Sequence, residues 1–228
     1  MKITIDLYKK IIKINELIFI TYNFNKGSMN GQIRVLNNSR IGIKLIKRTF
    51  STMEVLYSEP SLTIKNDNRV IKLFYYRPEG VLNENIINNL GRLLDILFNK
   101  KVKLELIKLS YPFLNREIYA KYLRLNSVRY PFRTLKKSMF KKRGIIEMSS
   151  LKTESKTPTE IVGIKVQISG RLETERSRPR KTVSTAHVGS TKSNNASIIE
   201  DFGSYTGKNA HGAYTVKVWI TEKTHLFS

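Results

Sequence analysis

The chain has 228 residues, a formal net charge of +23 at pH 7 and no cysteine. The missing cysteine excludes disulfides and thiolate metal sites, and no run of about 18 apolar residues is present to form a membrane span. A compact protein with this much positive charge repels itself, so we expect a polyanionic partner, with nucleic acid favoured over an anionic membrane surface.

The first third of the sequence has the weakest pattern. Apolar residues recur at helical spacing from Leu7 to Ile18, which predicts a helix over residues 1–20. Two short β segments are predicted next, at 32–36 and 41–46, because β-branched residues lie there between Gly and Asn breaks.

The amino-acid usage favours one compartment. Asn, Ile, Lys and Tyr are used heavily, which is typical of an AT-rich coding sequence. The first twenty residues have neither the cleavage site of a secretory signal nor the Arg/Ser richness of a transit peptide. Together these features favour a protein made inside an organelle.

From residue 69 onward, strands and helices are predicted in clear alternation. Residues 69–76 form a strand, and Asn83 caps a helix whose apolar face ends at Phe98. Residues 101–109 alternate as a second strand, and 115–126 form another amphipathic helix.

The chain then becomes basic before it turns polar. Pro131 suits the first turn of a helix that continues to about residue 142. Residues 149–160 are polar, contain a proline and lack periodicity, which predicts a linker or an inserted loop. The Ser/Thr/Asn-rich residues 184–197 are predicted to form a loop or an edge strand.

Two strands are predicted near the C-terminus. Residues 163–172 (GIKVQISGRL) and 215–220 (TVKVWI) alternate apolar with polar side chains, so each strand has one face for a core and one for water. Arg171 follows Gly170 where the first strand leaves the sheet. Trp219 shares a face with Lys217, and we expect its indole to pack against a helix rather than stack on a base.

The ISGRL and KVWI strings, in this order and at this separation, resemble the C-terminal domain of the small-subunit ribosomal protein S3 family. The resemblance covers 69–143 and 161–222 and is to the mitochondrial type, with a fungal-like, organelle-encoded character. It implies an α+β fold: a degenerate type II KH-like domain followed by a C-terminal α/β domain with an antiparallel or mixed sheet.

The resemblance also implies a domain organisation. Residues 1–68 would be an N-terminal extension and the start of the KH-like domain, 69–128 the KH-like domain, 129–160 a basic helix and linker, and 161–228 the C-terminal S3-type domain. The GxxG loop with which KH domains grip RNA has no match in residues 80–85, which lack its spacing and contain an acid. We therefore expect the KH-like domain to act as a scaffold.

The function implied by the resemblance is structural. The chain would be a constituent of the mitochondrial small ribosomal subunit, located in the matrix. It would bind rRNA in the head and line the channel through which mRNA enters. Its partners would be small-subunit rRNA, mRNA and neighbouring head proteins, with no membrane, cofactor or metal.

A basic helix is the first predicted RNA-binding segment. Residues 129–143 contain no acid, and Arg133, Lys137 and Lys141 are i, i+4 neighbours on one helix face. Like charges at this spacing destabilise an isolated helix by about 0.2–0.5 kcal/mol per pair, which favours neutralisation by phosphates over a solvated basic face. The resemblance implies that this helix faces the mRNA. Arg133 and Lys137 match the family pattern, whereas Thr134 replaces a basic residue.

A second basic tract follows Arg171. In an extended segment Arg176, Arg178 and Arg180 would project to one side, which suits bidentate contacts with rRNA phosphates. Surface ion pairs with nearby glutamates are the alternative. The residues predicted to bind RNA are Arg129, Arg133, Lys136, Lys137, Lys141, Arg171, Arg176, Arg178, Arg180, Lys181, Lys192 and Lys208.

Other functions fit the sequence less well. Residues 203–208 (GSYTGK) are one residue short of a phosphate-binding P-loop, and Asn209 stands where a magnesium-binding hydroxyl is needed. Glu200, Asp201 and His211 could serve a metal-dependent nuclease, but we expect them in a solvated, glycine-rich turn. No catalytic set is evident, so an enzyme is not expected. A free-standing RNA chaperone or intron-splicing factor would explain the charge equally well.

Overall fold

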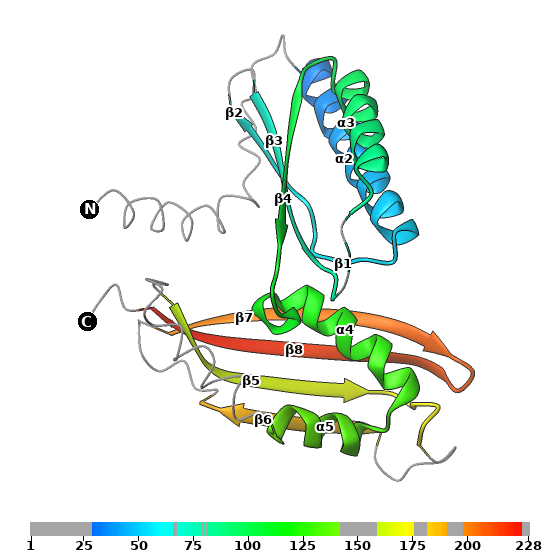
Figure 1. Ribbon diagram of the computed structural model, residues 1–228, viewed down its shortest axis with the longest axis vertical. Helices are drawn as coiled ribbons and strands as arrows, with labels where there is room; N and C mark the ends of the chain where they lie inside the picture. Colours follow the sequence, from blue (N-terminus) through cyan, green and yellow to red (C-terminus); the bar gives the residue numbers. More distant parts are fainter. Residues whose placement is uncertain are drawn as a thin grey trace. The chain divides into compact units, whose positions relative to one another are not determined.

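The computed structural model describes residues 29–65, 68–78, 80, 82–141, 159–175, 182–190 and 198–224. The chain forms two compact units, Met1–Ser110 and Tyr111–Ser228 (Figure 1). Each unit combines helices with a β-sheet, which confirms the α+β class. The helix predicted over residues 1–20 lies outside the described residues. No described helix is long and apolar enough to cross a membrane.

The N-terminal unit contains a mixed sheet. Its elements are α2 (Met29–Thr52), β1 (Leu56–Tyr57), β2 (Ser61–Lys65), β3 (Asn68–Tyr76), α3 (Glu84–Phe98) and β4 (Val102–Lys108). β4 pairs with β3 in parallel, whereas β1 and β2 pair antiparallel with opposite ends of β3. Because β4 occupies one edge of β3 along most of its length, β1 and β2 share the other edge.

The predicted elements 69–76, 83–98 and 101–109 are confirmed as β3, α3 and β4. Asn83 caps α3 by accepting a hydrogen bond from the Asn85 amide at 3.2 Å. Asp95 accepts the Val102 amide at 2.7 Å and so ties α3 to the start of β4. The core of the unit forms where Leu90, Leu94 and Phe98 of α3 meet the inward side chains of α2 and the sheet.

The two β segments predicted at 32–36 and 41–46 are wrong, because α2 spans both. Ile46 and Phe50 lie one turn apart and are buried in the core. Gly42 lies one turn earlier, where a Cβ atom would be 3.2 Å from the Phe98 ring, so the glycine lets α2 approach α3 closely. Burial of this helix face outweighs the strand preference of the β-branched residues.

The C-terminal unit contains a purely antiparallel sheet. Its elements are the 3-10 turn η1 (Pro112–Leu114), α4 (Arg116–Arg129), α5 (Phe132–Lys141), β5 (Thr159–Ser169), β6 (Val183–Gly189), β7 (Ile198–Asn209) and β8 (Gly212–Thr224). The strand order is β6-β5-β8-β7, so β5 and β8 are central and β6 is an edge strand.

The helices and the central strands of this unit confirm the predicted periodicity. Asn115 caps α4 by accepting the amides of Glu117 and Ile118 at 3.0 and 3.2 Å. One face of the sheet is buried under α4 and α5, which Figure 1 shows crossing the same side of it. The core residues on the central strands are Ile164, Val166, Ile168, Val216, Val218 and Ile220.

The predicted turn around Glu200 and Asp201 is wrong, because residues 198–209 form the long strand β7. A Cβ atom at Gly203 would lie 2.8 Å from the Arg116 backbone, and one at Gly207 would lie 3.1 Å from Arg124 Nε. Four strand residues and eight helix residues both span roughly 12–13 Å, so α4 runs along β7 over these glycines. The glycines of the GSYTGK string therefore let the helix pack closely on β7.

The unit boundary also differs from the predicted organisation. Residues 115–126 were expected within the KH-like region 69–128, but the corresponding helix α4 packs on the C-terminal sheet, and the units divide after Ser110. β5 begins at Thr159, two residues before the predicted C-terminal domain.

Candidate nucleic-acid interface

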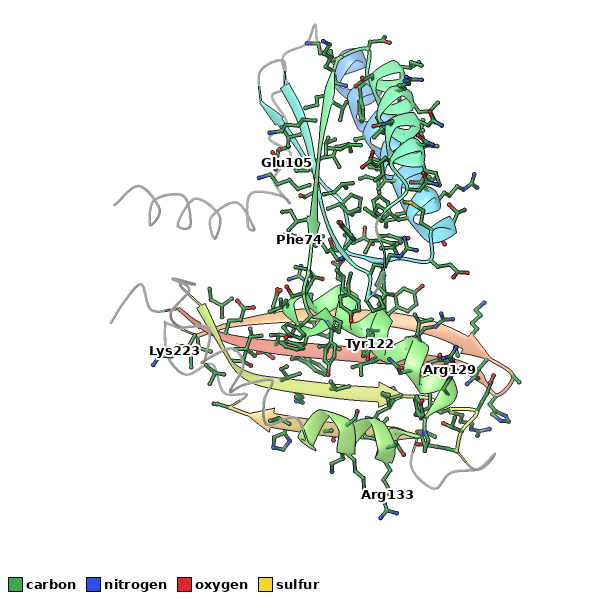
Figure 2. The ribbon with its side chains drawn as sticks, in the orientation of Figure 1. Phe74, Glu105, Tyr122, Arg129, Arg133 and Lys223 are labelled. Atoms are coloured by element: carbon green, nitrogen blue, oxygen red, sulfur yellow. The ribbon has the colours of Figure 1, made fainter. Side chains whose placement is uncertain are left out.

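The basic helix α5 has two distinct faces. Phe132 and Leu135 are buried in the core of the C-terminal unit, whereas Arg133, Lys136 and Lys137 are exposed. Figure 2 shows the Arg133 side chain extending away from the helix and the sheet. Lys141 ends the helix, and its side chain lies outside the described ones.

Two of the exposed charges of α5, Arg133 and Lys137, are not compensated within the described part of the unit. Neither Arg133 nor Lys137 forms an ion pair with a described carboxylate. Since the buried face fixes the helix on the sheet, both cations are held at the surface one helical turn apart. This arrangement suits an extended anion such as a nucleic-acid backbone.

Arg171 and Lys208 are exposed at one end of the C-terminal sheet. Gly170 has a φ of 114°, and a Cβ atom there would lie 2.7 Å from the Ala213 carbonyl oxygen, so only glycine fits this close approach. The Asn209 side-chain amide donates to the Arg171 carbonyl at 2.7 Å. The β7–β8 hairpin that carries Lys208 is thus fastened to the loop that carries Arg171.

Glu173 is one of the glutamates close to the second basic tract. In the structure its carboxylate accepts the Ala210 amide of the hairpin at 3.2 Å, which is a second tie between loop and hairpin. The remaining predicted residues of this tract lie outside the described residues: Arg176, Arg178, Arg180, Lys181 and Lys192. Arg129 is exposed at the last position of α4.

The proposed metal ligands do not converge. Asp201 forms an ion pair with Arg116 of α4. Glu200 is its neighbour on β7 and projects from the opposite face of the sheet. His211 lies beyond the end of the strand, roughly 25 Å or more from Asp201 at about 3.3 Å per residue. Among the described residues no group of three His, Cys, Asp or Glu side chains is arranged to hold a metal ion.

The outer face of the C-terminal sheet was not predicted from the sequence. Trp219 was expected to pack against a helix, but α4 and α5 cover the opposite face. Its ring instead lies 5.3 Å from that of Phe202, and the Lys165 ammonium is 5.0 Å from the centroid of the indole. Residues 200–208 gave no signal for this face, because the inward positions Asp201, Gly203 and Gly207 do not make an apolar alternation.

Comparisons with known proteins identify the family. The family model described as mitochondrial ribosomal protein (VAR1) matches residues 55–223, which include about half of the N-terminal unit and nearly all of the C-terminal unit. The small ribosomal subunit protein uS3m of Mycosarcoma maydis is 33% identical over 195 residues, which cover 76% of this chain and 70% of that protein. The chain belongs to the mitochondrial small-subunit ribosomal protein S3 family.

Membership of this family confirms the predicted resemblance, the mitochondrial ribosome as the location and a structural rather than an enzymatic role. The nuclease alternative is contradicted by this role and by the separation of its ligands. The matched residues contain α5, Arg171 and Lys208, so the basic surface belongs to the part of the chain that the family shares.

Proposed function

We propose that this S3-family chain binds rRNA in the head of the small subunit and lines the channel through which mRNA enters. The observation that carries the proposal is the geometry of α5. Its buried face fixes it on the sheet, and its other face presents Arg133 and Lys137 without a described carboxylate partner. Phosphates supply the missing counter-charge, and such contacts provide much of the affinity in nucleic-acid complexes.

Two parts of the C-terminal unit divide the work in this proposal. α5 contacts the mRNA through Arg133 and Lys137, while the hairpin end with Arg171 and Lys208 contacts folded rRNA. Residues 176–181 continue the rRNA contact. Arginine suits this role because its planar guanidinium binds phosphate through two parallel hydrogen bonds.

The N-terminal unit acts as a KH-like scaffold in the same proposal. A GxxG loop lies between two helices in KH domains that grip RNA. Among the described residues from β3 to β4, α3 is the one helix, so there is no helix–helix turn that could hold such a loop. We therefore assign this unit to packing against neighbouring head proteins.

The mRNA contact is tested by the double charge reversal Arg133→Glu with Lys137→Glu. Mitochondrial translation of messages with stable secondary structure should slow, while unstructured messages and assembly of the small subunit stay close to normal. Ribosome profiling together with sedimentation measures both. The control is Arg92→Glu with Lys101→Glu on the exposed surface of the N-terminal unit, which changes the net charge equally. Equal translation of both message classes in the α5 variant contradicts the mRNA role.

The rRNA contact is tested by changing Arg176, Arg178 and Arg180 together to Ala. Incorporation into small subunits should fall, as measured by density-gradient fractionation of mitochondrial lysate. Normal incorporation would show that these arginines do not contact rRNA. Sedimentation of the unaltered chain apart from the subunits would instead favour the free-standing RNA chaperone.

A further inference from the structure

The outer face of the C-terminal sheet presents an aromatic pair. Trp219 lies between the buried Val218 and Ile220 on β8, so its indole projects from the face opposite the core. Its register partner on β7 is Phe202, with ring centroids 5.3 Å apart and an interplanar angle of 45°. The Phe202 residue is 47% exposed. A large ring half in water next to an indole is a candidate contact for a flat apolar partner.

Lysines surround this pair. Lys165 of β5 is the other register partner of Trp219, and its ammonium lies 5.0 Å from the indole centroid. Lys217 is the next outward-facing residue of β8, and Lys208 lies near the end of β7 on the same face. The outward-facing residues of β7 from Glu200 to Lys208 have register partners on β8, and these have partners on β5 and β6. Among these described outward-facing residues, Glu200 is the one acid.

The remaining outward side chains of this face are small and polar. Thr206 and Thr215 hydrogen-bond across the β7–β8 ladder at 3.0 Å, and the Gln167 amide donates to Ser169 Oγ at 3.1 Å. Hydroxyls and amides of this kind can exchange these bonds for bonds to base edges or ribose. We call the surface formed by Phe202, Trp219, Lys165 and Lys217 the open sheet face.

The chemistry of the open sheet face selects among partners. An apolar protein surface would bury the lysines beside the rings without a counter-charge, which is costly. An RNA duplex presents phosphates but keeps its base faces stacked inside. Unpaired nucleotides supply both a flat base for an aromatic ring and a phosphate for a lysine, which is the combination found in proteins that bind single strands.

We propose that the open sheet face binds single-stranded RNA. A base stacks on the exposed ring of Phe202, and Lys165 and Lys217 bind the adjoining phosphates. Trp219 lies beside Phe202 on the neighbouring strand and positions its ring, and the Lys165 ammonium lies by its own indole. The inference rests on the proposed RNA-binding function and deepens it, because it names unpaired nucleotides as the target of one surface.

The chain offers its own probe, because Trp219 is its single tryptophan. A short oligoadenylate added to the full-length purified protein should quench Trp219 fluorescence, whereas an RNA duplex of equal length should quench it far less. Phe202→Ala should weaken oligoadenylate binding about 5- to 150-fold, as expected for loss of one stacked base. Duplex affinity should stay within about twofold, because phosphate contacts dominate it.

Two further variants separate stacking from folding. Phe202→Leu keeps an apolar side chain against Trp219 but removes the flat ring, so it should lose oligoadenylate affinity while urea unfolding of the C-terminal unit stays close to that of the unaltered chain. Leu125→Ala, at an α4 residue that is 49% exposed, is the matched control and should change neither RNA affinity.

Two results overturn the inference. In the first, Phe202→Ala and Phe202→Leu bind oligoadenylate with the same affinity as the unaltered chain. In the second, the variants lose as much affinity for the duplex as for oligoadenylate. Normal binding of both RNAs combined with loss of the variants from small subunits would assign the face to a protein partner and also overturn it. Failure of the proposed RNA-binding function can be told apart from failure of this inference. Duplex binding by the unaltered chain and incorporation of the arginine variant into small subunits test the proposed function without involving Phe202.

Discussion

The two units differ most in how their charged side chains are paired. In the N-terminal unit, Lys47 pairs with Glu59 at 2.6 Å, and Glu105 pairs with Lys72 and Lys103 at 3.1 and 3.2 Å. In the described part of the C-terminal unit, Arg116 pairs with Asp201 on the covered face of the sheet, while Arg133 and Lys137 of α5 have no described carboxylate partner. Exposed ion pairs add little to the stability of a fold. The difference in charge pairing between the units therefore matters more for what each surface can bind.

The outer faces of the two sheets show the same contrast. In the N-terminal sheet Phe74 of β3 shares the outer face with Glu105 of β4, and both are labelled in Figure 2. The two lysines beside them both pair with that glutamate. In the C-terminal sheet the lysines beside Trp219 have no described carboxylate of this kind. Aromatic residues occur on both faces, so the uncompensated charge distinguishes the surface that we assign to RNA.

The largest expected effect tests whether the units are independent. Leu94→Ala removes a fully buried side chain of α3 and should destabilise the N-terminal unit by about 2–5 kcal/mol through reduced burial and a residual cavity. Urea unfolding followed by far-UV circular dichroism should show an earlier transition, while Trp219 fluorescence, which reports the C-terminal unit, keeps its midpoint. An equal shift of both signals would mean that the units unfold together, and the comparison between them would fail.

The next effect addresses the C-terminal unit. Gly170→Ala places a side chain at a φ of 114° and against the Ala213 carbonyl, which should cost about 1–3 kcal/mol or more. The Trp219 transition should move to lower urea while the early circular-dichroism signal of the N-terminal unit does not.

Gly91→Ala is the control for this substitution. A Cβ atom at Gly91 in α3 meets nothing within 4 Å, so alanine should stabilise the N-terminal unit by about 0.5–1 kcal/mol. If Gly170→Ala were tolerated as well as Gly91→Ala, the close approach of Gly170 to the Ala213 carbonyl would not require glycine at this position.

The elements that the sequence predicts correctly have strong local signals. Asn83 and Asn115 cap helices with clear apolar faces, and buried residues alternate over 164–168 of β5 and 214–220 of β8. α2 was missed because its helical face depends on contact with Phe98, which lies far away in the sequence. β7 was missed because three of its inward positions are Asp201, Gly203 and Gly207, which carry no apolar signal.

The candidate site shows the same division. The basic face of α5 could be predicted because charge and helical spacing are both local. The open sheet face could not, because the side of the sheet on which Trp219 projects is decided by where α4 and α5 pack. The sequence alone does not place Phe202 beside Trp219, because their contact depends on the pairing of β7 with β8.

A smaller effect should appear in the salt dependence of RNA binding. Arg133→Gln with Lys137→Gln should lower the slope of log affinity against log salt by about 0.7–0.9 for each phosphate that the variant no longer binds. The matched double variant Lys72→Gln with Lys103→Gln should leave the slope unchanged, because Glu105 already occupies those lysines. Titration of an mRNA fragment over a range of KCl concentrations measures both. Equal slopes in the two variants would mean that pairing does not decide which unit meets RNA.

The smallest effect lies at Glu105. Hydrogen bonds from Lys72 and Lys103 hold the pKa of its carboxyl below the ordinary value. A lowered pKa in the folded state stabilises the fold above the unfolded pKa of about 4.3, and this contribution is lost as the pH falls through the folded pKa. Since the side chain is 29% exposed and screened by water, Glu105→Gln should cost at most about 1 kcal/mol at pH 7, and less at a low pH below the folded pKa, where the carboxyl is protonated in both states.

Urea unfolding of the N-terminal unit at the two pH values measures this difference. The same loss at both would assign Glu105 to packing rather than charge. The variant also releases Lys72 and Lys103 from their carboxylate while leaving the sheet intact. If charge pairing alone separates the two units, Glu105→Gln should make the salt slope of RNA binding steeper, because the freed lysines then release counterions of their own. An unchanged slope would show that the N-terminal sheet lacks the shape for RNA, even with its charge exposed.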